Sequence, residues 1–182
     1  MDQYAASNER VITSCVKTYI KESGAGNFPN LSSVSALAIV KDAKGKPHFP
    51  DLPQLHFSLA HSKDYVACAF AGQNIGLDLQ AHVKCDQQAI ARRYYHKEEF
   101  DYLEKTSYRQ FFSTWAAKES YAKYTGGGLA GQMDSFSVLG PYGLRKKLDQ
   151  AELWHHDAIN GYSMCLCAHT IRRVKIVDLR NK

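Results

Sequence analysis

The six residues IGLDLQ, at positions 75–80, combine an apolar face with a polar face. Side chains alternate along a β-strand, so the three aliphatic residues point one way, whereas Asp78 and Gln80 point the other way. Carboxylate and amide oxygens are ligands of Mg²⁺, which takes one or two carboxylates together with substrate phosphates. The pattern therefore marks a candidate magnesium site, and the solvent-facing side of an ordinary strand is the alternative interpretation.

A second acid lies on a helix that we predict at residues 108–124. At about 100° per residue, Trp115, Glu119 and Lys123 fall within one arc that continues an aromatic stripe. A carboxylate at the edge of an aromatic surface is partly desolvated, which raises its pKa and suits it to proton abstraction or metal binding. An exposed Glu–Lys pair four residues apart is the alternative interpretation.

A histidine stands at the end of a predicted strand, in the segment FSLAHSKD. Lys63 follows His61 closely, and Lys46 lies upstream in the tripeptide GKP. Cationic side chains grouped in this way are candidate contacts for phosphate. A solvated turn histidine is the alternative interpretation.

The elements that position these residues come in blocks of strands, then helices, then strands, which favours an α+β fold over a doubly wound parallel sheet. Short connections between the strands of the first block predict that these strands are antiparallel neighbours. Helices are predicted at residues 8–22, once or twice within 86–105, and at 108–124, where Gly126 ends the helix. Strands are predicted at residues 35–40, 56–60, 65–71, 75–80, 135–139, 151–157, 162–168 and 174–179.

Composition restricts the class of partner. The net charge of +5 favours an anionic ligand, but the lysines and arginines are dispersed, which disfavours a nucleic-acid module. The five cysteines form no C-x-x-C pair, so we expect free thiols in a reducing cytoplasm and no zinc cage. The sequence contains no long apolar run, and we expect no membrane span and no export signal.

Four segments, FSLAHS, YVACAF, IGLDLQ and FFSTWAAKESYAKYTGGGL, occur in that order and closely resemble the motifs of the surfactin-synthetase-activating type of 4'-phosphopantetheinyl transferase. ARRYYHKEEFDYL and MDSFSV resemble further segments of that family, so the resemblance runs from about Lys46 to the C-terminus. It implies two pseudo-symmetric α/β halves with small antiparallel sheets and a long helix. The expected halves are residues 1–72, with a shortened N-terminal part, and residues 73–182, which carry the catalytic residues.

The resemblance also implies roles for individual residues. Asp78 and Glu119 look like the magnesium ligands, and Glu119 also looks like the base that deprotonates the carrier serine. Lys123 is similar to the lysine that contacts the coenzyme A phosphates and assists the leaving group. Trp115 and Lys118 match the positions that seat the helix.

Further positions correspond to coenzyme A contacts. His61 resembles a phosphate contact, and Lys46 resembles the residue beside the adenine. Pro47 and Ser62 are further expected coenzyme A contacts, and Arg10 takes the place of an arginine that binds the 3'-phosphate. Two positions depart from the family pattern. Gln80 replaces an acidic ligand, so metal binding there is weak or passes through a water. Ala60 replaces a serine, so any hydroxyl contact at that position is lost.

The implied reaction moves 4'-phosphopantetheine from coenzyme A to a serine of an apo acyl or peptidyl carrier protein and releases 3',5'-ADP. Mg²⁺, with Mn²⁺ as a substitute, is the expected metal, and fatty acid, polyketide and nonribosomal peptide synthesis are the candidate pathways. We expect a monomer in the cytoplasm that binds neither nucleic acid nor membrane. The alternative is a degenerate relative that binds coenzyme A or a carrier protein without transfer.

Overall fold

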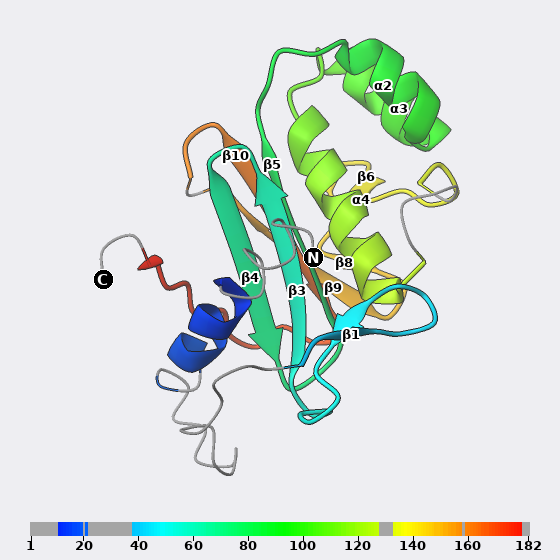
Figure 1. Cartoon of the computed structure of the whole chain (residues 1–182). Helices are drawn as coiled ribbons and strands as arrows, with labels where there is room; N and C mark the ends of the chain where they lie inside the picture. The colour runs from blue at the N-terminus through cyan, green and yellow to red at the C-terminus, as the bar shows by residue number, and fades with distance from the viewer. Residues whose placement is uncertain (1–10, 20, 22–37, 128–132, 158, 180–182) are drawn as a thin grey trace.

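The computed structural model describes residues 11–19, 21, 38–127, 133–157 and 159–179. Its main sheet is antiparallel and has the strand order β5–β10–β9–β8, with the long helix α4 lying along it (Figure 1). The strands of this sheet are β5 (Ile75–Ala81), β8 (Lys147–Leu148), β9 (Ala151–His156) and β10 (Tyr162–Ala168). The predicted α+β class is confirmed.

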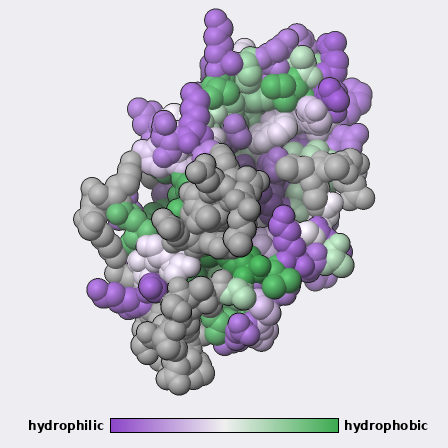
Figure 2. All heavy atoms as spheres, viewed as in Figure 1, coloured by the Kyte–Doolittle hydropathy of each residue, from purple (hydrophilic) through white to green (hydrophobic). Residues whose placement is uncertain are grey.

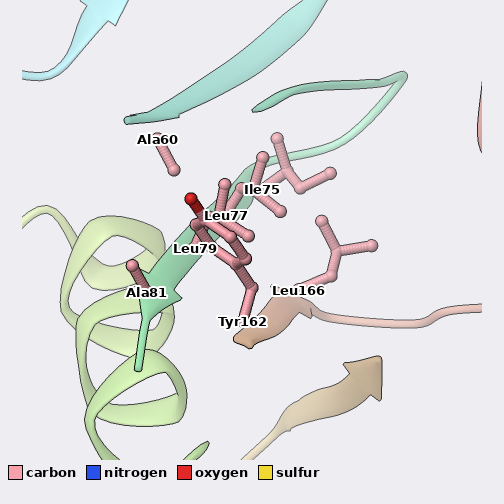
Figure 3. Packing of buried hydrophobic residues seen from close by; sticks show 7 residues of the cluster. All are labelled: Ala60, Ile75, Leu77, Leu79, Ala81, Tyr162 and Leu166. Carbon is pink, nitrogen blue, oxygen red and sulfur yellow. The ribbon is translucent and has the colours of Figure 1, made fainter. Parts of the chain in front are cut away.

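The strand β5 divides its side chains as the alternation predicts. Its aliphatic residues join a buried cluster with residues of β3 and β10, shown in Figure 3: Ala60, Ile75, Leu77, Leu79, Ala81, Tyr162 and Leu166. Its opposite face meets α4 (Phe111–Thr125), whose alanines pack with Leu153, Cys165 and Cys167 of the sheet. The polar face of β5 is therefore enclosed between strand and helix.

A hairpin of β3 (His56–Ser62) and β4 (Tyr65–Ala71) lies beside β5. The main-chain N–H groups of Leu77 and Ala81 donate to the hydroxyls of Ser58 and Ser62, each at 2.9 Å. Both partners advance by four residues, so β3 and β5 run in the same direction and are joined through serine side chains. We call this line of contacts the serine seam.

The outer face of the hairpin is covered by residues from the beginning of the described chain. Residues 11–19 are helical, and Ile12 and Val16 are buried there with Phe49, Leu55 and Phe57. Two short strands, β1 (Val40–Lys41) and β2 (Pro47–His48), form a hairpin that leads into this core.

Two shorter helices precede α4 at one end of the sheet. They are α2 (Gln87–Tyr94) and α3 (Lys97–Lys105), and they pack with the start of α4 around Ala91, Tyr95, Leu103 and Phe111. On the face viewed in Figure 2, hydrophilic residues line the outer edge of this end of the molecule. A small hairpin of β6 (Leu139–Gly140) and β7 (Gly143–Leu144) completes the described elements. No helix in the described ranges is long and apolar enough to cross a membrane.

Several sequence predictions of elements are wrong. Residues 174–179 form no strand; Val174 packs against the apolar cluster of β5 without pairing. Of the strand predicted at 135–139, only Leu139 is extended, because that segment turns around buried polar groups. The strand β5 pairs with β10 rather than with β4, since the serine hydroxyls occupy its other edge. The strand predicted at 35–40 is described only from residue 38, and Val40 begins β1.

Candidate active site

Gly76 allows α4 to lie directly on β5. A Cβ atom at this position would come within 2.0 Å of the carbonyl oxygen of Ser120 and 2.6 Å of the amide nitrogen of Tyr124. No side chain fits in that space, so only glycine permits this close approach of strand and helix. The contact brings the polar face of β5 against the second half of α4, where Glu119 and Lys123 lie.

Asp78 and Lys123 form an ion pair between these two elements. Lys123 Nζ donates to Asp78 Oδ1 at 2.8 Å, and it also donates to the carbonyl oxygens of Leu77 at 3.0 Å and Leu59 at 3.5 Å. The ammonium therefore lies over the serine seam, in contact with both β3 and β5. The side chain of Asp78 is 10% exposed, and that of Lys123 is 30% exposed.

Glu119, on α4, is the second buried carboxyl group of the site after Asp78 on β5. Burial, and then the negative charge of Asp78, raise the pKa of Glu119 to about 7, while the Lys123 ammonium opposes the shift. Burial also raises the pKa of Asp78 above its ordinary value, again opposed by Lys123. The two carboxyl groups therefore influence each other in one desolvated site.

These residues fit a divalent cation. Asp78 Oδ2 is buried, and no hydrogen bond within the described residues satisfies it, so it is an oxygen available to a ligand. Two carboxylates held together in low dielectric are the donor set that Mg²⁺ accepts. Gln80 contributes only an amide, whose nitrogen lies 3.4 Å from the carbonyl of Ala81. Within the described ranges, no group of three or more His, Cys, Asp or Glu residues lies close enough together to hold a metal ion.

Beyond Gln80, the polar face continues into a chain of hydroxyl groups. Ser163 lies opposite Gln80 on β10, and its hydroxyl is 2.8 Å from that of Ser113 on α4. His82 Nε2 is 2.9 Å from the same Ser163 oxygen, and its ring stacks on Phe112. Nothing in the sequence motifs marks Ser113, His82 or Ser163, although His82 continues the i, i+2 series of Asp78 and Gln80.

The predicted coenzyme A contacts are only partly brought together. His61 is exposed near the end of β3, while the hydroxyl of Ser62 already accepts the Ala81 N–H in the serine seam. Pro47 begins β2. Arg10 lies outside the described residues. The coenzyme A roles of all four remain predictions.

The ammonium of Lys46 binds the end of α4. It donates to the carbonyl oxygens of Ile75 and Lys123, both at 2.9 Å, and to the side-chain oxygen of Asn74. Asn74 in turn donates to the carbonyl of Tyr124 at 2.7 Å, and Gly126 ends the helix in a left-handed conformation. A cation at a helix C-terminus stabilises it, so Lys46 has a structural function before any ligand binds.

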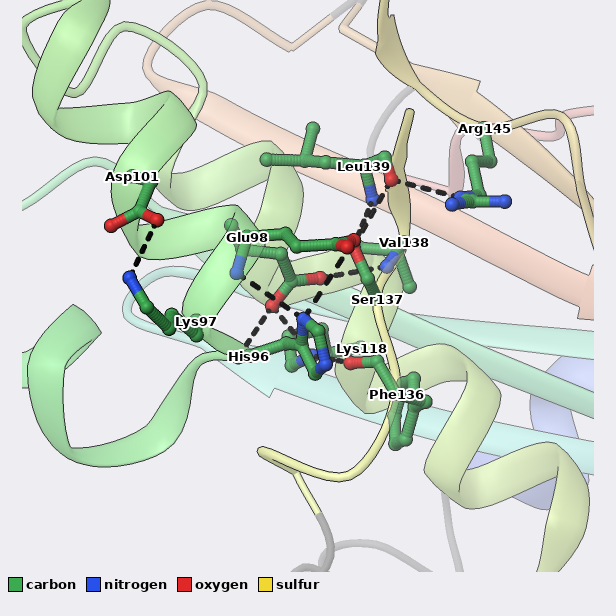
Figure 4. Close-up of polar contacts among 11 residues, drawn as sticks. His96, Lys97, Glu98, Asp101, Lys118, Phe136, Ser137, Val138, Leu139 and Arg145 are labelled. Carbon is green, nitrogen blue, oxygen red and sulfur yellow. Dashed lines mark hydrogen bonds and ion pairs between the residues drawn. The ribbon is translucent and has the colours of Figure 1, made fainter. Parts of the chain in front are cut away.

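Lys118 anchors the other side of α4 and is fully buried. Lys118 Nζ lies 2.7 Å from Glu99 Oε2 and donates to the carbonyl of Phe136 at 2.5 Å. Glu99 also accepts the N–H groups of His96, in the capping box of α3, and of Val138. Figure 4 shows Lys118 beside Phe136 and close to the start of α3, with Ser137 and Val138 in the same group of polar contacts.

The interaction of Lys118 agrees with its predicted role in seating the helix. Trp115 also fixes the position of α4, because its ring contacts the rings of Tyr94 and Tyr95 at the end of α2. Glu99 was given no role from the sequence. Two signals pointed to it: its place in the family-like segment ARRYYHKEEFDYL, and its place three residues after His96, where a capping glutamate is common.

Comparison with known proteins places this site in a family. The sequence profile of the 4'-phosphopantetheinyl transferase superfamily matches residues 74–167, a range that contains β5, α4 and all but the last residue of β10. The chain is 43% identical over 100 residues to the 4'-phosphopantetheinyl transferase Sfp of Bacillus subtilis strain 168, covering 52% of this chain and 43% of that protein.

Other relatives give the same result. The 4'-phosphopantetheinyl transferase ffp of Bacillus subtilis is 37% identical over 136 residues, covering 68% of this chain and 59% of that protein. The 4'-phosphopantetheinyl transferase HetI of Nostoc sp. is 33% identical over 98 residues, covering 49% of this chain and 41% of that protein. The chain thus spans about half the length of the curated relatives it matches. On the profile match and these similarities, the chain belongs to the 4'-phosphopantetheinyl transferase superfamily and is of the Sfp type.

Proposed function

We propose that this chain transfers the 4'-phosphopantetheine arm of coenzyme A to a serine of an apo acyl or peptidyl carrier protein. The observation that carries the proposal is the enclosed group of Asp78, Glu119 and Lys123, in which one carboxylate oxygen has no hydrogen-bond partner among the residues that the structure describes. The relatives, all named as 4'-phosphopantetheinyl transferases, support the reaction class.

The proposed chemistry assigns a task to each of the three residues. Asp78 and Glu119 would hold Mg²⁺, or Mn²⁺ in its place. When bound there, the ion supplies stabilisation of the charge that develops on the phosphate oxygens. The Lys123 ammonium, the only group of the three that is positive, would face the same oxygens and support the leaving group.

Proton transfer falls to Glu119. In the metal-free chain, burial raises the pKa of Glu119 to about 7, so its carboxylate is a stronger base than an exposed one. We assign to this carboxylate the deprotonation of the carrier serine. The serine oxygen then forms a bond to the β-phosphorus of coenzyme A. The bond from that phosphorus to the bridging oxygen breaks, and 3',5'-ADP leaves with the electron pair of that bond.

A transfer assay tests the proposal. The chain is incubated with coenzyme A, Mg²⁺ and an apo-carrier protein, and the intact mass of the carrier is measured. We expect a mass gain of one phosphopantetheine arm, which is absent when the carrier serine is replaced by alanine. A panel of carriers from fatty acid, polyketide and nonribosomal peptide synthesis identifies the preferred partner.

Gln80 favours a second candidate function, in which the chain binds coenzyme A or a carrier without transfer. An amide at this position leaves the site with one carboxylate fewer than the family pattern. Binding of coenzyme A without any mass gain on the carriers supports this second function and contradicts the first. Recovery of transfer by Gln80→Glu would identify the amide as the cause.

A further inference from the structure

The ammonium of Lys123 occupies one of the two oxygens that Asp78 presents. It lies 2.8 Å from Oδ1, while Oδ2 is buried and has no hydrogen-bond partner among the described residues. A divalent cation at Asp78 would therefore bind the unpaired Oδ2, while the positive charge of Lys123 stays on Oδ1 of the same carboxylate.

The ammonium does not depend on Asp78 alone for its position. Its other contacts are the carbonyl oxygens of Leu77 at 3.0 Å and Leu59 at 3.5 Å, on the two strands of the serine seam. These carbonyls hold the positive charge beside the site even when Asp78 turns to another ligand. Lys123 and a bound cation would thus share the site and repel each other.

We propose that Lys123 is a built-in counter-ion of Asp78 and Glu119 that keeps the affinity for a divalent cation low until an anionic co-substrate binds. The inference rests on the proposed function, which places the cation at these two carboxylates. Gln80 strengthens the effect, because a neutral amide adds no negative charge to balance the ammonium. A phosphate group bound at the site would draw Lys123 and the cation together and so couple their binding.

Binding of Mn²⁺ without coenzyme A or carrier tests the inference. Free Mn²⁺ is measured by electron paramagnetic resonance in mixtures with the wild-type chain and with Lys123→Gln. Unit charges within a few ångströms interact strongly near a protein surface, so we expect Lys123→Gln to bind Mn²⁺ roughly tenfold more tightly or better. Unchanged or weaker binding by this variant would overturn the inference.

Two matched variants distinguish the effect of the positive charge of Lys123 from a general effect of removing a lysine. Lys123→Arg keeps the positive charge and should bind Mn²⁺ as the wild type does. Lys97→Gln breaks another Lys–Asp pair of 2.8 Å, on the exposed face of α3, and should also leave binding unchanged. Tightening in Lys97→Gln equal to that in Lys123→Gln would count against a local effect of Lys123.

Asp78→Asn distinguishes failure of the inference from failure of the proposed site. If Asp78→Asn abolishes Mn²⁺ binding while Lys123→Gln leaves it unchanged, the site stands and only the inference fails. If Mn²⁺ binding is insensitive to both substitutions, both fail.

A measurement on the wild-type chain covers the case in which Lys123→Gln does not fold. Mn²⁺ should speed the acetylation of Lys123 by acetic anhydride relative to that of Lys97, because the ion pair with Asp78 is weakened. Peptide mass spectrometry quantifies both sites, and an unchanged ratio would overturn the inference.

Discussion

Glu119 is the residue whose ionisation the fold changes most clearly in the candidate site. Its carboxyl group is buried on α4, close enough to Asp78 for that charge to add to the effect of burial. The pKa of about 7 lies above the ordinary value of 4.5, so the folded chain binds this proton more tightly than the unfolded chain does. The stability that this proton contributes is fully present below about pH 4.5 and is lost as the pH rises through 7.

Glu119→Gln should therefore stabilise the metal-free protein at alkaline pH. At pH 8 the variant no longer holds a buried charge, and we expect its free energy of unfolding to exceed that of the wild type by about 2 kcal/mol. The difference should shrink steadily towards pH 5. Urea unfolding in the presence of a chelator measures it, with the exposed Glu104→Gln as the control that shows no such trend. A constant difference from pH 5 to pH 8 would contradict the raised pKa.

Sequence alone predicted the members of the central group but not their contacts. Alternation along β5 put Asp78 on a polar face, and the helical arc of α4 put Glu119 and Lys123 on one stripe. These patterns are local, and only the family resemblance implied that the two faces meet. The carbonyl contacts of Lys46, by contrast, join residues 29 and 77 positions apart, so no local pattern reports them. The partner of Lys118 was missed for the same reason.

At the scale of elements, the contact between β5 and α4 depends on Gly76. The two elements carry opposite halves of the candidate site, and the main chain of α4 lies where a side chain of residue 76 would be. A shift of the helix by even one methyl group would separate Glu119 and Lys123 from Asp78.

Gly76→Ala should destabilise the protein by about 3 kcal/mol or more, because the new methyl group overlaps the backbone of Ser120. Gly72→Ala is the matched control, since a Cβ there meets nothing within 4 Å, and it should change stability by less than about 0.5 kcal/mol. Thermal and urea unfolding of both variants provide the comparison. Equal stability of the two would show that strand and helix are less closely packed than described.

The successes and failures in predicting elements have a common physical basis. The strands β4 and β10 agree with their predicted bounds because their runs are apolar and end at turn residues. The segment 174–179 is similarly apolar. Its Val174 is partly buried against the cluster of β3, β5 and β10, and this packing does not require the segment to pair as a strand. Hydrophobic pattern predicts burial, whereas strand pairing requires a free edge, and that is a property of the whole sheet.

At the scale of the whole molecule, the site lies where three separate supports meet. The serine seam holds β3 against β5, the contacts of Lys46 and Asn74 hold the end of α4, and the Lys118–Glu99 pair ties α4 to α3 and to the segment 136–138. The division into halves at residues 72 and 73 remains a prediction. The apolar cluster that joins β3, β5 and β10 crosses that boundary.

The rate of phosphopantetheine transfer by Glu119→Gln tests the account most directly, because the proposed chemistry makes this carboxyl group both a metal ligand and the base. With coenzyme A, Mg²⁺ and a carrier that the wild type modifies, we predict a rate lower by about 100-fold or more, since the variant lacks both a metal ligand and a base. Glu104→Gln, which removes an exposed carboxylate of α3, should transfer at the wild-type rate. Transfer by Glu119→Gln at the wild-type rate would contradict the assignment of the active site to β5 and α4.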